Sequence, residues 1–363
     1  MDAYPIGLRK EELDTPTLCL DAEALERNIA RMAAFMRSRG VGLRPHSKTH
    51  KCPTIAWKQL EAGAVGITCA KVSEAEVMAR AGIQEILIAN QIVTPHKIAR
   101  LVNLAAYTHV TVAVEDLANA EALSEAAQAK GVRLRTIIEV DVGMGRCGTP
   151  PGEPTLALAQ KMLSLKGLDF RGLMGYEGHA VMIPDREARR QAVEVAMTRL
   201  LETRDLLLHH GIPVEVVSAG GTGTYEITSQ YQGITDLQCG SYATMDAKYR
   251  SVGIDFEQAL TVIARVISVR GADHAVIDAG MKTLTTEFGL PQVVYPQGWV
   301  LARLSEEHGI LSRQGGEPLA RGDLVEIVPS HGCTTINLHA AYTVLRKGVV
   351  EAIWPIAARG CVQ

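Results

Sequence analysis

The stretch LRPHSKTHK, residues 43–51, follows a short β-prone run and contains five basic or imidazole side chains among nine residues. No apolar residue follows Pro45 within it, so the pattern indicates a strand that ends at a polar site. Pro53 suits the first turn of a following helix. Composition alone would favour a solvated basic loop. The position near the chain start, the following helix and glycine-rich strand ends further along favour a barrel whose first strand carries a reactive lysine, Lys48.

Short β-branched runs alternate with helical patterns from Val41 onwards, and eight runs can be counted with the one at Val41. The other seven are Val65–Ala70, Glu85–Ala89, His109–Val114, Arg133–Val140, Phe170–Gly175, Pro213–Val217 and Asp236–Cys239. The helical patterns are Ala22–Arg39, Thr54–Ala62, Ser73–Ala81, Pro95–Ala105, Leu117–Lys130, Glu153–Leu165 and Asp185–His210. This alternation predicts an α/β fold, a TIM-like (β/α)8 barrel of parallel strands spanning residues 22–250.

The pattern changes after Tyr249, where strand-like segments are separated by turns and no long helical period occurs. These segments are Val262–Val269, Ala275–Asp278, Val293–Tyr295, Trp299–Arg303, Asp323–Val328, Ala341–Leu345 and Val349–Trp354. We therefore expect a second, C-terminal antiparallel β-domain formed by residues 251–363. The strand-like run Thr17–Leu20 precedes the barrel, so residues 1–21 are expected to join this β-domain.

The composition limits the classes of protein that the chain can represent. With 363 residues, 47% of them hydrophobic, it can build a full barrel and a smaller domain. The net charge of −3 gives no electrostatic reason to expect nucleic acid or a membrane as partner. Residues 1–8 lack a signal-peptide pattern, and no apolar run approaches the ~20 residues that span a bilayer. Seven cysteines without paired spacing favour a cytoplasmic protein with reduced thiols.

Polar and glycine-rich clusters follow several predicted strands, at the edge where barrel active sites lie. The turn Gly220–Gly223 exposes backbone N–H groups and precedes a short helical pattern, which suits a phosphate, although a plain tight turn is the commoner outcome. Barrel phosphate sites are often made by the loops after strands seven and eight, and Gly240–Tyr242 follows strand eight. A lysine on strand one opposite such a cradle indicates pyridoxal 5'-phosphate as cofactor.

A possible metal site follows the predicted strand Asp323–Val328, at His331 and Cys333. On an extended chain these two side chains point to the same side and can reach one ion. A buried thiol beside a hydrogen-bonded histidine is the alternative interpretation. Two protein ligands would leave coordination positions for substrate. A thiolate favours zinc over magnesium, with manganese as an alternative.

Several motifs together resemble the D-threonine aldolase group and its D-serine dehydratase relatives, which are alanine-racemase-like pyridoxal phosphate enzymes of fold type III. They are RPHSKTHK at 44–51, EVDVGMGRCG at 139–148, GGTG at 220–223, GSYATMD at 240–246 and IAARG at 356–360. The resemblance extends from about Thr15 to the C-terminus. It implies a barrel with a β-domain, and a head-to-tail homodimer whose active sites lie near the interface.

The resemblance also implies roles for individual residues. Lys48 would hold the cofactor as a Schiff base, and Arg146 would address the pyridine nitrogen, leaving it unprotonated. Tyr176 would stack on the cofactor or form a hydrogen bond near it. His331 and Cys333 would hold a divalent metal, zinc, manganese or magnesium. The full set of expected cofactor-binding residues is Lys48, Arg146, Tyr176, Gly221, Thr222, Gly223, Gly240, Ser241 and Tyr242.

Two positions depart from the pattern of the aldolases in this group. Many of them carry aspartate where Cys333 stands, and His-x-Cys also resembles the D-serine and 3-hydroxyaspartate dehydratases. The sequence Glu177-Gly178-His179 replaces a pattern in which histidine follows the tyrosine directly. His179 is therefore our candidate for the acid–base group, and the two departures leave the reaction type open.

The leading hypothesis is a carbon–carbon lyase that uses pyridoxal phosphate and a divalent metal. It would cleave a 3-hydroxy D-amino acid such as D-threonine to glycine and an aldehyde. The first alternative is a D-serine or 3-hydroxyaspartate dehydratase that forms a 2-oxo acid and ammonia. An amino-acid racemase is a second alternative, disfavoured because it needs no metal. A non-catalytic pyridoxal phosphate carrier is usually the barrel alone, so the long β-domain argues against it.

Overall fold

The computed structural model describes residues 5–363 and divides the chain into two compact units, which are treated separately below. The expectations for residues 1–4 lie outside the described part. The barrel unit comprises residues 32–48, 55–240 and 361–363. The sheet unit comprises the described residues up to 31, residues 49–54 and residues 241–360. The sheet unit thus takes 22–31, 49–54 and 241–250, which we had assigned to the barrel.

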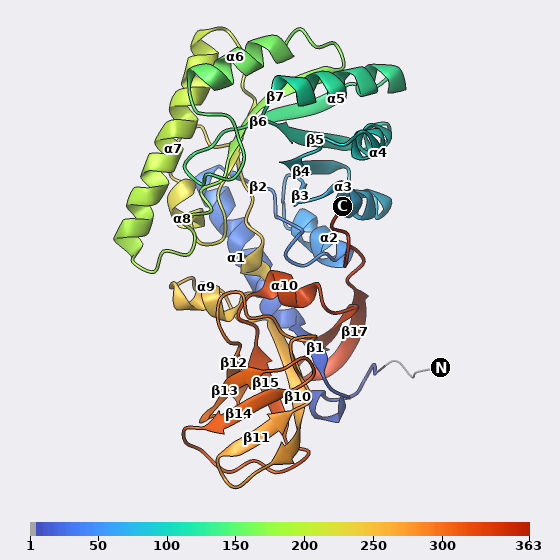
Figure 1. The fold of residues 1–363 in the computed structure, drawn as a ribbon, viewed down its shortest axis with the longest axis vertical. Coiled ribbons are helices and arrows are strands. Elements are labelled where there is room, and N and C mark those ends of the chain that lie inside the picture. The colour runs from blue at the N-terminus through green and yellow to red at the C-terminus, as the bar shows by residue number, and fades with distance from the viewer. Residues whose placement is uncertain (1–4) are drawn as a thin grey trace. The chain divides into compact units, whose positions relative to one another are not determined.

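The barrel unit contains eight parallel strands in the order β2-β9-β8-β7-β6-β5-β4-β3 (Figure 1). An isolated parallel bridge between His46 and Thr68 connects the two ends of this order. His46 lies just after β2, and Thr68 belongs to β3. The strands are β2 (Gly42–Leu43), β3 (Ile67–Cys69), β4 (Glu85–Gln91), β5 (His109–Val114), β6 (Leu134–Glu139), β7 (Leu168–Gly175), β8 (Val216–Ala219) and β9 (Asp236–Leu237). The predicted eight-stranded barrel is confirmed.

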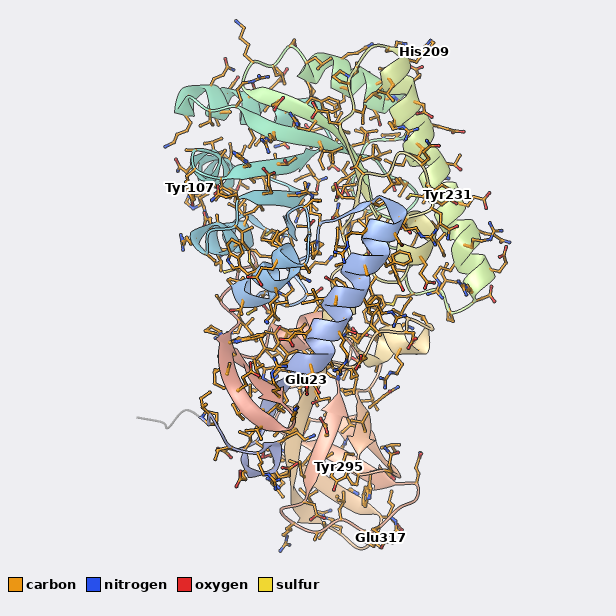
Figure 2. All side chains as sticks on the ribbon, turned by 180° about the vertical axis from the view of Figure 1, so that it is seen from behind. Glu23, Tyr107, His209, Tyr231, Tyr295 and Glu317 are labelled. Carbon is orange, nitrogen blue, oxygen red and sulfur yellow. The ribbon has the colours of Figure 1, made fainter. Side chains whose placement is uncertain are left out.

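Helices connect most of these strands, and the long helix α7 ends at His209, which Figure 2 labels. The helices are α1 (Ala22–Arg39), α2 (Pro53–Glu61), α3 (Val72–Arg80), α4 (Pro95–Ala105), α5 (Leu117–Lys130), α6 (Glu153–Met162), α7 (Arg186–His209) and α8 (Tyr225–Thr228). Local signals set their ends. The side chain of Asp116 accepts the N–H of Asn119 at the start of α5, and Gly131 ends it with φ of 75°.

The core of the barrel unit is aliphatic, as the low aromatic content requires. Leu87, Ala113, Ile137 and Met174 form one buried cluster contributed by four neighbouring strands, β4 to β7. Each of these side chains is at most 2% exposed. Because buried apolar side chains hold adjacent strands in register, this layer fixes the positions of the strand ends that follow it.

The sheet unit contains a nine-stranded sheet that is antiparallel except where β1 pairs with β16 in parallel. As predicted, the run at Thr17–Leu20 joins this sheet as β1 (Thr17–Asp21). The other strands are β10 (Leu260–Val269), β11 (His274–Ile277), β12 (Gln292–Tyr295), β13 (Trp299–Leu304), β14 (Gly309–Arg313), β15 (Leu324–Val328), β16 (Ala341–Arg346) and β17 (Val349–Pro355). Strand β14 was not predicted.

Short helices complete the sheet unit. They are the 3-10 turns η1 (Lys10–Glu12) and η2 (Ser241–Ala243) and the α-helices α9 (Ala247–Ser251) and α10 (Gly332–Ile336). Helix α10 contradicts in part our premise that His331 and Cys333 lie on extended chain, because Cys333 is helical, whereas His331, the N-cap, has extended dihedral angles. In residues 5–363, no helix is long and apolar enough to cross a membrane.

Candidate functional site

The segment that carries Lys48 is held firmly at the end of β2. The hydroxyl of Ser47 is fully buried, donates to the carbonyl of Thr68 at 3.0 Å and also bonds the carboxylate of Glu74. Glu74 is itself fully buried and accepts the N–H of Ala70 at 3.0 Å. This network fixes the backbone beside Lys48 while the lysine side chain stays only partly buried.

Tyr176 directly follows β7, and its ring lies near two of the residues that the sequence singled out. The ring centroid is 5.9 Å from Nζ of Lys48 and 5.8 Å from the guanidinium carbon of Arg146. Two glycines make room for the ring. A Cβ on Gly178 would lie 2.6 Å from one ring carbon, and a Cβ on Gly221 would lie 3.1 Å from another. The structure therefore brings Lys48, Arg146 and Tyr176 together.

The loop after β6 presents Arg146, whose side chain is 48% exposed. Asp141 fixes the loop by accepting the N–H groups of Gly143 and Gly145, each at 3.0 Å, and these bonds lower the pKa of its carboxyl group. The guanidinium of Arg146 lies 3.7 Å from the carboxylate of Glu139, the last residue of β6. Burial raises the pKa of Glu139, opposed by a hydrogen bond from Gln91 and by the charge of Arg146.

The glycine-rich turn after β8 is shaped by bonds within the chain. The N–H of Gly220 donates to Glu177 at 3.1 Å, and the N–H of Gly221 donates to the hydroxyl of Thr224 at 3.2 Å. A Cβ on Gly223 would lie 2.0 Å from the carbonyl oxygen of Val181, so only glycine fits there. Sequence reasoning did not anticipate Glu177, a fully buried carboxylate behind this turn. Thr222 lies buried within it.

His179, our candidate acid–base group, is exposed in this structure. Its ring lies against the turn at Gly143, where an added Cβ would be 3.5 Å from the imidazole Cε1. The structure thus places His179 beside the loop that carries Arg146. Its catalytic role stays a prediction.

The residues after β9 divide between the two units. Gly240 ends the barrel unit, whereas Ser241 and Tyr242 belong to the sheet unit. Tyr242 is fully buried, and its ring packs 5.6 Å from that of Phe256, centroid to centroid. Its ring therefore packs in the core of the sheet unit, and its expected contact with the cofactor stays a prediction.

The side chains of His331 and Cys333 lie close together in the sheet unit, at the start of α10. The Nδ1–H of His331 donates to the carboxylate of Asp246 at 2.7 Å, which leaves Nε2 as the nitrogen that can bind a metal. Burial lowers the pKa of His331, but the charge of Cys333 and hydrogen bonds to Cys333 and Asp246 outweigh this effect and raise it to about 11. Sγ of Cys333 lies 3.4 Å from the hydroxyl oxygen of Thr49.

The surroundings of this pair orient it further. Asp246 is fully buried and also accepts the N–H of Gly332 at 3.0 Å, so one carboxylate fixes both the imidazole and the backbone of α10. The ring of Phe288 packs edge-on against His331 with centroids 5.1 Å apart. Within residues 5–363, no group of three or more His, Cys, Asp or Glu side chains is arranged to hold a metal. The imidazole and thiol are suitable donors for zinc, and they are the two donors that the described residues bring together here.

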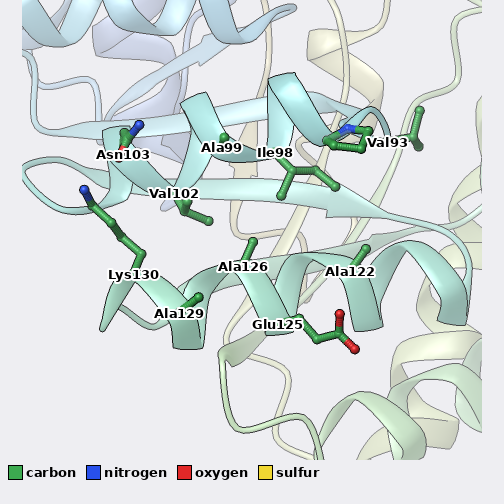
Figure 3. Close-up of a pocket in the computed structure, with 11 residues that line it drawn as sticks. Val93, Ile98, Ala99, Val102, Asn103, Ala122, Glu125, Ala126, Ala129 and Lys130 are labelled. Carbon is green, nitrogen blue, oxygen red and sulfur yellow. The ribbon is translucent and has the colours of Figure 1, made fainter.

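A separate groove of about 520 Å³ lies between α4 and α5 (Figure 3). Its lining is mainly apolar, with Val102 and Ala126 facing one another across it and Glu125 and Lys130 among the few charged residues. None of the site residues expected from the sequence lines this groove. It therefore offers no chemistry that relates to Lys48.

The sequence patterns of two known domains match the two parts of the chain. The pattern of the alanine racemase N-terminal domain matches residues 20–248, and that of a putative serine dehydratase domain matches residues 259–345. Fold and site together thus define a protein of the alanine-racemase-like class. Within this class, the chain belongs to the D-threonine aldolase family.

The relatives that show this are similar over nearly their whole length. The chain is 40% identical to D-threonine aldolase from an Arthrobacter species, over 96% of this chain and 93% of the relative. It is 38% identical to 3-hydroxy-D-aspartate aldolase from Paracoccus denitrificans, over 98% and 94% of the two chains. The crystal structure of D-threonine aldolase from Filomicrobium marinum has a TM-score of 0.96 and 38% identity, covering 99% of this chain and 100% of that one.

A dehydratase is similar at a lower level. The structure of a cysteine-to-alanine mutant of D-threo-3-hydroxyaspartate dehydratase, in the metal-free form, has a TM-score of 0.89 and 30% identity. It covers 96% of this chain and 98% of that chain. The aldolases are therefore the more similar group among these relatives.

Proposed function

We propose that this protein is a lyase that cleaves the Cα–Cβ bond of 3-hydroxy D-amino acids, such as D-threonine or 3-hydroxy-D-aspartate, using pyridoxal phosphate and a divalent metal. The observation that carries the proposal is the cluster of Lys48, Tyr176 and Arg146 at the strand ends of an alanine-racemase-like barrel. Identities of 38% and 40% to two aldolases, against 30% to a dehydratase, favour carbon–carbon cleavage.

The barrel unit has the residues that pyridoxal phosphate needs, and membership of the alanine-racemase-like family implies this cofactor. When bound, the cofactor withdraws electrons from the bonds at the substrate Cα. Lys48 would hold it covalently, Arg146 would donate a hydrogen bond to its pyridine nitrogen, and the ring of Tyr176 would pack beside it. The Gly220–Gly223 turn would bind its phosphate, with Gly240 on the neighbouring strand end.

The sheet unit would hold the metal through Nε2 of His331 and Sγ of Cys333, and the remaining coordination positions would be open to water or substrate. Thr49, the contact of Cys333, directly follows Lys48 in the chain. A cation bound there would lower the pKa of the substrate hydroxyl group. Supporting a metal in this group of enzymes, a mutant of the related D-threo-3-hydroxyaspartate dehydratase is described as being in the metal-free form.

The proposed reaction moves one proton away from oxygen and one onto carbon. A base, for which His179 is the candidate, takes the proton of the 3-hydroxyl group. The Cα–Cβ bond then breaks, Cβ becomes an aldehyde carbon, and a proton added at Cα gives glycine. In the alternative dehydration, Lys48 would remove the Cα proton and the hydroxyl group would leave.

A substrate panel tests the proposal. The purified protein, supplied with pyridoxal phosphate and Mn²⁺ or Zn²⁺, is incubated with D-threonine, 3-hydroxy-D-aspartate, D-serine and L-threonine, and the aldehyde released is measured. We expect aldehyde from D-threonine or 3-hydroxy-D-aspartate and none from L-threonine. Racemisation of these substrates without aldehyde release would contradict the proposal and favour the racemase alternative.

Arg146 supplies a smaller, separate prediction. Replacing Arg146 with alanine should weaken pyridoxal phosphate binding by about threefold to tenfold, a modest effect because the guanidinium is half exposed and screened by water. The affinity of Arg146→Lys should fall between those of the wild type and Arg146→Ala, since lysine keeps the charge but loses the planar donor geometry. Titration of the apoprotein by visible absorbance measures the affinity, with Arg190→Ala on α7 as control. Wild-type affinity and kinetics in Arg146→Ala would make it an ordinary loop residue.

We also propose that the protein is a cytoplasmic homodimer. The seven cysteines all lie in the described part of the chain, and none of them is paired in a disulfide, as expected in a reducing compartment. The exposed side chains of Met281, Phe288 and Leu290 on one loop of the sheet unit would suit a subunit contact. Analytical ultracentrifugation at micromolar concentration should give twice the chain mass, and a monomer would contradict the proposal.

A further inference from the structure

The side chain of Glu177 is fully buried immediately after Tyr176, in a position that the proposed reaction does not use. Its carboxylate accepts three hydrogen bonds, from the N–H of Gly220 at 3.1 Å and from the hydroxyls of Thr224 at 2.7 Å and Thr228 at 2.5 Å. A buried carboxylate is costly unless such donors compensate for lost water. Three donors of this kind indicate a carboxylate that organises the surrounding backbone.

Two of these bonds connect Glu177 to the glycine-rich turn. Gly220 has a φ of 77°, and its N–H bonds the carboxylate directly. The N–H of Gly221 donates to Thr224 Oγ1 at 3.2 Å, and that hydroxyl in turn donates to Glu177. One carboxylate thus sets the orientation of two successive peptide groups, the first directly and the second through Thr224. The hydroxyl of Thr228 bonds the same carboxylate from within α8, and the link of Thr228 to the turn is made by its backbone N–H, which donates to the carbonyl of Thr224 at 2.9 Å and is kept in a side-chain variant.

The turn also contacts the candidate active site on its other side. Gly221 lies against the ring of Tyr176, the residue that precedes Glu177, because a Cβ added to Gly221 would be only 3.1 Å from a ring carbon. Tyr176 and Glu177, the two residues that follow β7, thus both contact this turn, Tyr176 with its ring and Glu177 with its carboxylate. The position of the turn is therefore coupled to the strand end that carries Tyr176.

We propose that Glu177, acting through Thr224, is a positioning residue that holds the Gly220–Thr224 turn in the conformation that binds the phosphate group of the cofactor. This inference rests on the proposed function, because it takes pyridoxal phosphate as the ligand. It goes beyond the proposed function because it assigns a role to one further side chain. The hydroxyl of Thr224, which is buried behind the turn, is needed for recognition of the phosphate rather than of the pyridine ring.

Two isosteric variants and two ligands test the proposal. Thr224→Val removes the hydroxyl that links Gly221 to Glu177, and Thr228→Val removes a hydroxyl that bonds the same carboxylate only. Each apoprotein is titrated with pyridoxal phosphate and with pyridoxal, which lacks the phosphate, and each affinity is compared with the wild-type value. We expect Thr224→Val to lose about tenfold or more for pyridoxal phosphate and less than about twofold for pyridoxal.

The controls separate positioning from general destabilisation. Thr228→Val should affect the two ligands equally, and Thr224→Ser, which keeps the hydroxyl, should restore the preference for the phosphorylated ligand. An unchanged preference in Thr224→Val, or equal losses for both ligands, would overturn the inference and leave the proposed function intact. A wild-type protein that binds both compounds equally would instead overturn the assignment of the turn as the phosphate site, and the inference with it.

Discussion

Replacement of Lys48 by alanine is expected to reduce cleavage of D-threonine to background while the protein keeps its fold. Lys48 is the partly buried amine beside Tyr176, on a strand end fixed by Ser47 and Glu74, and a Schiff base with the cofactor needs its amine group. Steady-state assays with saturating pyridoxal phosphate and metal measure the loss. Lys71→Ala, at the start of α3, is the matched control and should keep full activity.

Chemical labelling is a second, independent test of the covalent bond between Lys48 and the cofactor. Borohydride reduction of the wild-type protein should attach the cofactor irreversibly to the peptide that contains Lys48, as shown by mass spectrometry. Lys48→Ala should take up no label under the same conditions. Attachment to Lys51 or Lys71 would contradict the assignment of the strand end, as would substantial activity in Lys48→Ala.

Removal of the metal is expected to have the second large effect. Chelation, or the Cys333→Ala substitution, should lower cleavage by about a thousandfold or more, because a bound cation would contribute several kcal/mol by stabilising charge on the substrate oxygen. The visible absorbance of the bound cofactor should be unchanged, because Lys48 and the Gly220–Gly223 turn lie in the barrel unit. Assays with metal content measured in parallel test both statements.

Two further variants test whether the loss of activity is specific to the proposed metal ligands, His331 and Cys333. Cys333→Asp should recover part of the activity with Mn²⁺, because a carboxylate is a harder ligand than a thiolate. Cys361→Ala, which removes another partly exposed thiol, should behave as wild type. Full activity after exhaustive chelation, in a protein found to contain no metal, would refute the metal assignment and restore the racemase alternative.

The barrel could be predicted from the sequence because its signals are local. The runs of apolar and β-branched residues in β4, β5 and β6 are continuous, and the caps of α5 are visible as Asp116 and Gly131. The residues at the strand ends, Lys48, Arg146 and Tyr176, could be grouped because parallel strands in a barrel all end at one edge. The structure confirms that these three lie together.

The missed elements depend on contacts between distant parts of the chain. Strand β14 has only Ile310 and Leu311 as consecutive apolar residues, and it is a strand because β11 and β13 pair with it on both sides. Helix α10 is held at its start by Asp246, which is 86 residues from Gly332. Local propensity does not report such pairings, so Cys333 was wrongly expected to lie on extended chain.

Glu177 was missed for the same reason. The sequence shows a glutamate between Tyr176 and Gly178, which would be an ordinary surface residue in most loops. Its three hydrogen-bond partners lie 43 to 51 residues further along the chain. Only the folded barrel brings the end of β7 beside the turn after β8, because these two strands are neighbours in the sheet.

The most direct test of the proposed reaction is the ratio of glycine to ammonia released from one 3-hydroxy D-amino acid. The wild-type protein, with pyridoxal phosphate and Mn²⁺ present, is given whichever of D-threonine and 3-hydroxy-D-aspartate it consumes faster, and both products are quantified at early times. Carbon–carbon cleavage predicts one glycine for each aldehyde and no ammonia. Release of ammonia with an equal amount of 2-oxo acid, and no glycine, would contradict the account and identify a dehydratase.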